Sequence, residues 1–421
     1  MCGRELSLPS SQKRKETAYC AKKNVVRRTR NLYVVFSFLL QKSPNTVVTE
    51  EPQDDVSFIS VMLGHKNIEE WNERNVIANV AWNKLKLSDD DEKKFPKLKK
   101  TFDKLNANAL KDAKALMYEL SDAAKDLEGD EYNPLYLEGE SKIFIQRADT
   151  RIVSYLEDVC IHSGGVHPDY YYLTSNFNPK TGKKLILTDV MSSIRGLPDI
   201  LEGEIVGKYD YLNFEQNQLW TIFKEYSPED YKWTIDYQGI TFWFSPYDIA
   251  SFAAGPLSVK LYFDEHPYII RDEYKKAPSD SFGMMLPIRQ KIDFDLNPND
   301  EKRDCIEIDT LSGQYGSYNM LSVTVNGKTF INEINYAYEF DVYLAHIGDK
   351  NYIYSDSWSD NHDHVFCTWD INGASPEMIQ ELYGTELDYE FIEEGFEDGA
   401  VYKTVFNNPQ SFKFEEFLYA G

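Results

Sequence analysis

The sequence predicts an α+β fold: antiparallel sheet and packed helices come first, and a mostly β C-terminal region follows. Aromatic residues reach 14%, with 29 Tyr and 24 Phe, and such residues are enriched in strands. Apolar residues recur at helical spacing mainly between residues 88 and 129. From Pro278 onward, strand-like runs alternate with turn signals. A chain of 421 residues is long enough for several domains.

Composition and turn signals divide the chain into four predicted segments. We predict a leader or a disordered basic segment at 1–50, an α+β domain at 51–190, a smaller domain at 191–277 and a β-rich domain at 278–421. In the first segment, basic residues precede the nine-residue apolar run Leu32–Leu40. This run is too short for a membrane span but fits the core of an export signal. No small-x-small cleavage site follows, so the signal is degenerate, and a disordered basic tail stays an alternative.

The pattern of residues 56–137 is mixed, with helix dominant. Ser88-Asp-Asp-Asp91 has the pattern of a helix N-cap. Apolar residues follow at three- and four-residue spacing, and Gly129 ends the pattern. We expect Trp71 and Trp82, in the preceding part of this segment, to be core contacts.

The middle of the chain alternates between strands, turns and a helix. The predicted strands are 141–146, 151–159, 170–178, a return strand at 184–187 after the turn 178–182, and an aromatic pair within 231–244. The segment 192–205 reads as helical although Gly196 and Pro198 interrupt it.

Turn residues separate the predicted strands of the C-terminal region. Asn326-Gly327 is the strongest hairpin signal in the chain. Gly348-Asp349 and Ser359–His364 separate further strands, which predicts an all-β meander or sandwich. A weak helical stripe lies near 376–382.

The stretch Gly239–Pro256 is a strand-turn-helix pattern. Pro246 cannot continue a central strand because it lacks an N–H. A short helical turn then ends at Gly255-Pro256, and we expect Phe242, Phe244 and Phe252 to fill a core.

The best-placed histidines of the middle region lie at a predicted turn. His162 and His167 flank Gly164-Gly165, and a catalytic base there would need a partner acid and a pocket. Asp158 and Asp169 are near in sequence, but a turn histidine bonded to backbone is the favoured interpretation. We therefore predict no catalytic residue, and keep four weak candidates for binding: His162, Gly164, Gly165 and His167.

No metal or cofactor is expected. His362 and His364 are weak candidates for metal ligands, because residues two apart on a strand point the same way, but no third ligand is fixed by spacing. The five Cys form no CxxC pair. Phosphate-binding, nucleophile-elbow and HExxH motifs are absent from the sequence.

The net charge of the chain indicates which kinds of partner it can bind. The net charge is −24; residues 1–42 carry a net of +8, which leaves −32 for the rest. Such a body repels phosphate backbones, so we expect no nucleic-acid partner. It attracts a cationic partner by electrostatic steering, although acidity also serves solubility alone.

Three motifs together resemble a known family. Gly239–Gly255, with Ser-Pro-Tyr-Asp and Ala-Ala-Gly-Pro, resembles the C-terminal domain of the RsiV-like family, which includes the extracytoplasmic lysozyme-sensing domain of RsiV-type anti-sigma factors. Upstream, Ser163–Pro168 and Asn176–Asp189 look like the accessory domain that accompanies it, which is also found in PdaC-type peptidoglycan deacetylases. The resemblance covers about residues 60–275, making 51–190 the accessory domain and 191–277 the RsiV-like domain.

The resemblance implies a non-catalytic binding protein, secreted or attached to the surface of a bacterium. It implies a ligand such as lysozyme, another envelope component or cell-wall glycan. The metal-dependent deacetylase unit of PdaC-type enzymes is not seen here, and we expect no transmembrane span. Two alternatives stay open: an enzyme acting on cell-wall glycan, and a structural envelope domain with neither ligand nor turnover.

Overall fold

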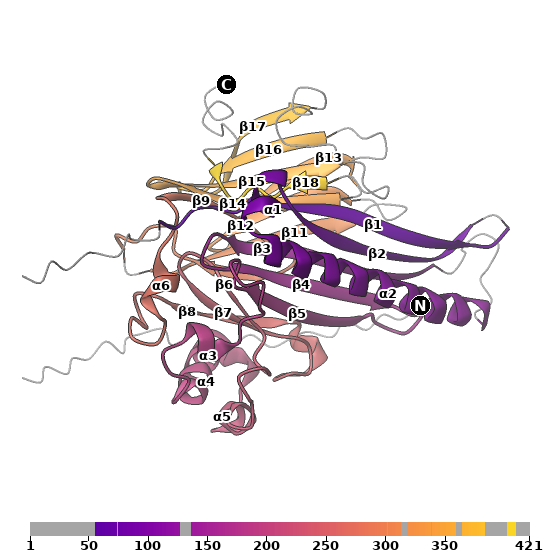
Figure 1. Ribbon diagram of the computed structural model, residues 1–421. Coiled ribbons are helices and arrows are strands. Elements are labelled where there is room, and N and C mark those ends of the chain that lie inside the picture. The colour runs from indigo at the N-terminus through magenta and orange to yellow at the C-terminus, as the bar shows by residue number, and fades with distance from the viewer. Residues whose placement is uncertain are drawn as a thin grey trace, which may run out of the picture. The chain divides into compact units, whose positions relative to one another are not determined.

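The computed structural model describes residues 55–73, 75–126, 136–300, 302–312, 318–337, 339–358, 364–383 and 402–409. The predicted leader or basic segment at 1–50 lies outside these residues. Several antiparallel sheets and a small number of helices make up the described chain, which confirms the α+β prediction with a β-rich C-terminal region (Figure 1).

A six-stranded sheet carries the first part of the fold. Its order is β18-β1-β2-β3-β4-β5, and every neighbouring pair is antiparallel except β2 and β3. The strands are β1 (Val61–Trp71), β2 (Val76–Leu87), β3 (Leu137–Ala148), β4 (Val153–His162), β5 (Asp169–Phe177) and β18 (Tyr402–Thr404). The parallel pairing arises because two helices separate β2 from β3 in the chain.

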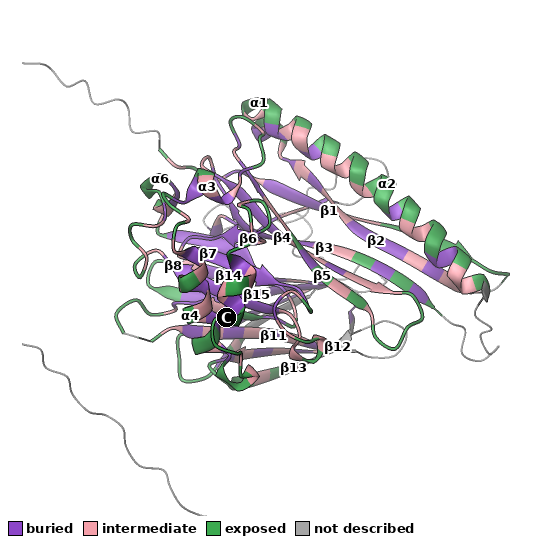
Figure 2. Ribbon diagram, turned by 90° about the horizontal axis from the view of Figure 1, so that it is seen from below, coloured by how far each residue is buried: buried purple, intermediate pink, exposed green. Residues whose placement is uncertain are grey.

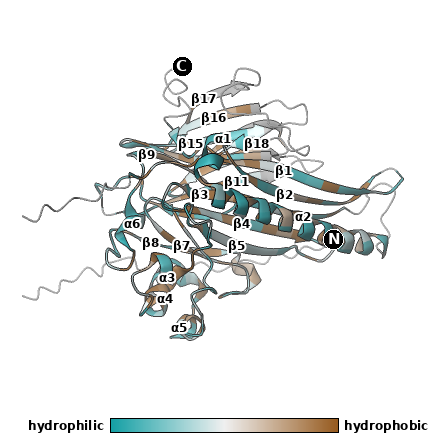
Figure 3. Cartoon of the chain, viewed as in Figure 1, coloured by the Kyte–Doolittle hydropathy of each residue, from teal (hydrophilic) through white to brown (hydrophobic). Residues whose placement is uncertain are grey.

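Helices α1 (Asp89–Lys94) and α2 (Pro96–Asp126) follow the predicted pattern. Ser88 caps α1, where its hydroxyl accepts the Asp91 N–H at 3.3 Å, which confirms the N-cap. Leucine, alanine and methionine side chains of α2 pack on one face of the sheet, and its outward side is exposed and hydrophilic (Figures 2 and 3).

The two early tryptophans lie in strands and differ in burial. Trp82 of β2 is buried under α2, as expected for a core contact. The prediction was wrong for Trp71, which is 58% exposed and donates its indole N–H to Glu69 at 3.0 Å. Trp71 is the last residue of β1, beyond the part of the sheet that α2 covers with buried side chains.

A three-stranded sheet and short helices form the middle of the chain. The sheet is β6 (Trp233–Ile235), β7 (Gly239–Phe244) and β8 (Leu257–Tyr262), which confirms the aromatic strand pair. Around it lie α3 (Leu187–Val190), α4 (Leu197–Lys208), η1 (Asp210–Leu212), α5 (Gln218–Phe223), η2 (Phe252–Ala254) and α6 (Asp272–Lys275).

Two local predictions in this region were inaccurate. The return strand at 184–187 is not formed: one bridge joins Phe177 to Lys184, and α3 begins at Leu187. Asp189 favours this helical turn because its carboxylate accepts the Ile186 N–H at 2.9 Å. The helix expected from residue 192 begins at Leu197, because Gly196 has φ 82°.

The strand-turn-helix prediction for Gly239–Pro256 is confirmed. Strand β7 ends before Pro246, and η2 follows. Phe242 and Phe244 are buried in the core. The expectation for Phe252 was wrong, because this ring is only partly buried and packs against His167, outside the core.

Two further sheets hold the C-terminal region. One has the order β10-β11-β12-β13 and the other β17-β16-β15-β14-β9. Their strands are β9 (Ser281–Met285), β10 (Lys291–Phe294), β11 (Asp304–Ser312), β12 (Tyr318–Val325), β13 (Lys328–Ala337), β14 (Glu339–Ile347), β15 (Lys350–Trp358), β16 (His364–Asp370) and β17 (Glu377–Tyr383). One buried cluster contains side chains of both sheets and of the first sheet, including Ile145, Met285 and Ile308.

The turn chemistry here is as predicted. Asn326 and Gly327 have φ 52° and 76° between β12 and β13, as a type I′ hairpin requires. Gly348, with φ 61°, joins β14 to β15. The helical stripe near 376–382 was a wrong prediction, because this segment pairs with β16 as β17.

A buried guanidinium joins the first sheet to the middle region. Arg147 of β3 is completely buried and forms an ion pair with Asp149 at 2.6 Å. It donates to the backbone carbonyls of Asp236, Tyr274 and Lys276 at 3.2, 2.6 and 2.7 Å. These carbonyls lie in the turn after β6 and at the end of α6. The Arg147 side chain therefore joins both of these segments to β3.

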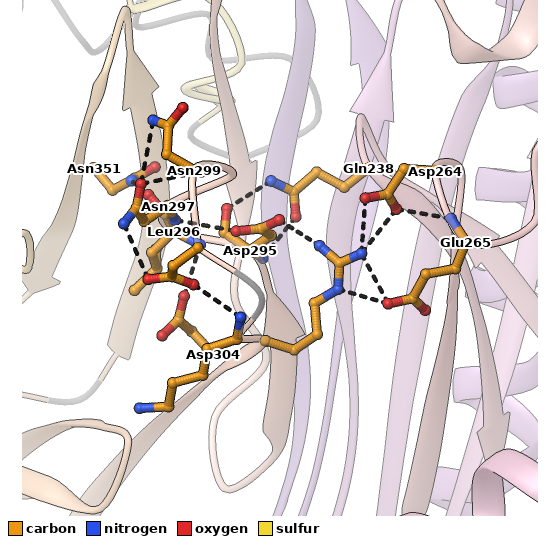
Figure 4. A network of polar contacts seen from close by, with 12 residues as sticks. Gln238, Asp264, Glu265, Asp295, Leu296, Asn297, Asn299, Asp304 and Asn351 are labelled. Atoms are coloured by element: carbon orange, nitrogen blue, oxygen red, sulfur yellow. Dashed lines mark hydrogen bonds and ion pairs between the residues drawn. The ribbon is translucent and has the colours of Figure 1, made fainter. Parts of the chain in front are cut away.

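A second, more exposed arginine joins β8 to the C-terminal region. Arg303 binds Asp264 and Glu265, which follow β8, and Asp295, which follows β10. Figure 4 shows these carboxylates converging on one guanidinium, with Gln238 bonded to Asp295 beside them. Although partial burial acts against it, the hydrogen bonds from Arg303 hold the pKa of Asp264 below its usual value.

Among the described residues, no helix combines the length and the apolar character that crossing a bilayer requires.

We predict that Arg147→Met lowers the free energy of unfolding by about 3–5 kcal/mol, because Asp149 and three carbonyls lose their buried donor. Urea unfolding followed by circular dichroism measures it. Arg195→Met, at an exposed arginine, is the matched control and should change stability by less than about 0.5 kcal/mol. Equal effects of the two substitutions would contradict the role of Arg147.

Candidate functional site

A polar cavity of about 210 Å³ lies between the first sheet and the C-terminal region. Its floor is the face of the sheet opposite α2, where Glu140, Cys160 and Tyr170 are direct neighbours in register across β3, β4 and β5. Glu138 and Asp158 lie on the same face two residues away. The remaining walls come from β1, β2, β11, β14, β18 and the segment between β9 and β10: Leu63, His65, Asn83, Ile288, Arg289, Thr310, Phe340, Asp341 and Lys403.

Asp158 is a buried carboxyl of the cavity whose pKa is strongly raised. One of its carboxyl oxygens accepts a hydrogen bond from the Tyr170 hydroxyl, and the other, Oδ1, is buried with no hydrogen-bond partner among the described residues. Burial raises the pKa of Asp158 to about 7, against the effect of the Tyr170 bond, and the charge of Glu140 adds to the increase. Part of the Asp158 population is therefore neutral at physiological pH.

Neighbouring acids of the cavity add to the rise in pKa that burial causes, although the charges of Lys142 and Arg289 act in the opposite direction on Asp158. Burial raises the pKa of Glu138, and the nearby Glu140 raises it further. Burial and the carboxylates of Asp158, Glu138 and Glu140 raise the pKa of the Cys160 thiol to about 11, so this thiol stays protonated. Within the described chain, Glu138, Glu140 and Asp158 form no ion pair.

The lysines of the cavity are already paired. Lys142 and Lys403 lie 3.6 and 3.4 Å from Asp341. Burial acts to raise the pKa of Asp341, but these two ammonium groups hold it below its usual value. Arg289 lies at the rim, where its side chain is 61% exposed and 3.6 Å from Asp309. The cavity thus holds one neutralised carboxylate and three that lack a counter-ion.

Aromatic packing holds Tyr170 in place. Its ring meets Tyr172 edge-on at 5.6 Å, and Tyr172 meets Trp243 of β7 at 5.5 Å. The Tyr172 N–H donates to Ser245 at 3.0 Å. Gln290 Nε2 approaches the Tyr170 oxygen at 3.5 Å from the other side. The segment Gly239–Pro256 therefore supports the cavity without lining it.

Backbone strain marks the rim. Arg289 has φ 63°, in a region that residues with a Cβ rarely occupy. Its N–H donates to Ile308 of β11 at 2.6 Å, which fixes the segment over the cavity. Such conformations are common at ligand-binding positions.

The structure separates the four predicted binding candidates. His162, at the end of β4, is opposite Glu138, and its charge would lower the pKa of that carboxyl. Gly164 and Gly165 lie in an exposed turn, with φ 89° at Gly164. His167 is exposed, its Nδ1 lies 3.2 Å from the Pro168 carbonyl oxygen, and its ring stacks on Phe252. None of the four lines the polar cavity.

The metal candidates fall outside the description. His362 is not among the described residues, and the side chain of His364, the first residue of β16, is not described. Among the described residues, no group of three His, Cys, Asp or Glu is arranged to hold a metal ion.

Sequence reasoning missed Glu138, Glu140 and Tyr170, and it considered Asp158 only as an acid near His162. A signal was present: acidic residues two apart, at Glu138-x-Glu140, precede an apolar strand. Residues two apart on a strand lie on the same face of a sheet. The sequence does not show, however, which strand pairs with β3.

Comparison with known proteins gives a family without an assigned activity. Residues 197–264 match the profile of the family described as "Protein of unknown function (DUF3298)". This segment runs from the start of α4 to just beyond β8, within the predicted RsiV-like domain. The RsiV-like and PdaC-type assignments themselves stay predictions. No curated protein matches the chain.

Seven solved chains are similar to this one. A member of the DUF3298 family from Bacteroides fragilis is 16% identical with a TM-score of 0.35, covering 50% of this chain and 94% of its own. A DUF3298 family protein from Pseudomonas aeruginosa is 14% identical with a TM-score of 0.34, covering 52% of this chain and 95% of its own.

We predict that Asp158→Asn stabilises the protein more at pH 8 than at pH 4. Because the folded pKa of Asp158 is raised to about 7, its stabilising contribution is fully present below its unfolded pKa and is lost as pH rises through 7. Asparagine does not ionise, so the variant gains on the order of 2–4 kcal/mol over this range. Urea unfolding at pH 4, 6 and 8 measures it.

The control is Asp280→Asn, at an exposed turn position. If the substitution also alters the hydrogen bond to Tyr170, the unfolding free energy of Asp158→Asn shifts by the same amount at each pH. Its dependence on pH is then unchanged. If the difference in unfolding free energy between Asp158→Asn and wild type is the same at pH 4, 6 and 8, the pKa of Asp158 is not raised by folding.

Proposed function

We propose that this protein is a non-catalytic binding module of the bacterial envelope, of the RsiV-like kind, and that its polar cavity receives cationic groups of the ligand. The observation that carries the proposal is the set of three cavity carboxyls, Glu138, Glu140 and Asp158, that form no ion pair within the described chain. A cation that binds beside a buried carboxyl favours its ionised form and so gives that charge a partner.

The ligand class follows from charge. The whole chain carries −24, so a cationic protein is attracted at long range before the cavity is reached. A basic protein such as lysozyme, or a cationic envelope component, has the required groups. An extracytoplasmic location is part of this proposal, and it is supported by the resemblance of Gly239–Gly255 to the RsiV-like family.

Titration calorimetry with lysozyme at about 20 and 300 mM salt tests the proposal. We expect binding at low salt that weakens at high salt, since exposed charges are screened. Glu140→Gln should weaken low-salt binding by about tenfold, which corresponds to the loss of one charge-assisted contact. Glu225→Gln, at a carboxylate that is 77% exposed on α5's C-terminal side, is the control and should leave affinity unchanged.

No heat with lysozyme at low salt would exclude the lysozyme version. The cationic-ligand proposal would fail if Glu140→Gln and Glu225→Gln had equal effects on binding.

A second candidate function has one observation in its favour. An aspartic acid with a pKa of about 7, bonded to Tyr170, suits general acid catalysis on a cell-wall glycan. Peptidoglycan fragments incubated with the protein should stay intact under our proposal. Turnover that Asp158→Asn abolishes would instead identify an enzyme and overturn the non-catalytic assignment.

A further inference from the structure

A second pocket, of about 280 Å³, shares Tyr170 with the polar cavity. We call it the aromatic cup. Its walls are aromatic rings from three segments, the turn after β4, the start of β5 and the segment after β7, and one carboxylate lies among them. The cup is lined by Ile161, His167, Asp169, Tyr170, Tyr171, Pro246, Tyr247 and Phe252.

The rings of the cup are held close together. The His167 and Phe252 rings stack at 4.0 Å with an interplanar angle of 24°. Tyr247 lies 5.8 Å from Phe252 at 36°. Through this stacking, His167 of the exposed turn that carries Gly164 and Gly165 forms part of the wall of the cup.

The Tyr247 side chain is exposed although its backbone conformation is unfavourable for a bulky residue. It has φ 72°, where a bulky side chain is uncommon, and it is 68% exposed. Asn or Gly would fit this backbone better, and burial does not account for the ring. An exposed ring on a strained backbone is typical of a recognition position.

Carboxylates lie in and near the aromatic cup. Burial raises the pKa of Tyr171, and the carboxylates of Glu157, Asp112 and Asp169 raise it further. Of these acids, Asp169 lines the cup itself. The described lining contains no lysine or arginine. Aromatic faces beside a carboxylate are the features that attract an organic cation.

We propose that the aromatic cup binds a lysine or arginine side chain of the ligand, with the cation over Tyr247 and Phe252 and hydrogen-bonded to Asp169. This inference rests on the proposed function, because it adds a second contact for the same cationic partner. Tyr170 lines both pockets, so the two proposed contact sites for the ligand are adjacent. Two linked contacts bind more tightly than either alone.

The test uses tetralysine as the probe in titration calorimetry at low salt. Tetra(Nε-acetyl-lysine) is the matched peptide without side-chain charge. Tyr247→Gly removes the ring and suits φ 72°, so the fold is retained. Phe252→Leu keeps apolar volume without a ring, and Asp169→Asn removes the charge. Tyr268→Ala, at a tyrosine that is 90% exposed elsewhere, is the control.

We expect Tyr247→Gly, Phe252→Leu and Asp169→Asn each to weaken tetralysine binding by at least fivefold. Tyr268→Ala should have no effect, and the acetylated peptide should not bind. The cup assignment is overturned if the three cup variants bind like wild type while Glu140→Gln weakens binding, and the proposed function then stands. Equal binding of the acetylated peptide overturns the cationic class. If wild type binds neither peptide, both proposals fail.

Discussion

The structure depends on the burial of one charge, the Arg147 guanidinium. A buried cation is tolerated only with an anion and with hydrogen-bond acceptors for its remaining donors. Asp149 supplies the anion, and carbonyls of the β6–β7 turn and the end of α6 supply acceptors. The small sheet must therefore sit where these carbonyls meet β3. That placement brings Trp243 against Tyr172, and so sets the position of Tyr170 and its bond to Asp158.

The polar cavity contains carboxyls of two kinds, and the contrast indicates what it is for. Asp341 has two lysine partners and a lowered pKa, as expected of a structural ion pair. Asp158 has a hydroxyl donor, an unsatisfied buried oxygen and a raised pKa. A fold gains nothing in stability from the second arrangement. The unfavourable free energy of this unpaired carboxyl is offset when a cation binds beside it, and the proposed function rests on this compensation.

Features fixed by local chemistry were predictable from the sequence. Ser88, the Asn326-Gly327 turn and Pro246 each determine backbone geometry within a few residues, and each lies where expected. Features set by distant partners were not predictable. Residues 376–382 carry helical spacing, yet pairing with β16 makes them a strand. The acidic cluster depends on the register between β3 and β4, and the aromatic cup depends on His167 meeting Phe252, 85 residues further along the chain.

The central claim is that Asp158 is held partly neutral until a cation binds near it. A carbon-13 NMR titration of the Asp158 carboxyl, assigned with Asp158→Asn, measures this state directly. We predict a pKa near 7 for this carboxyl in the free protein and a lower pKa when tetralysine is present at saturation. A pKa near 4 in the free protein, or one that tetralysine does not change, would contradict it.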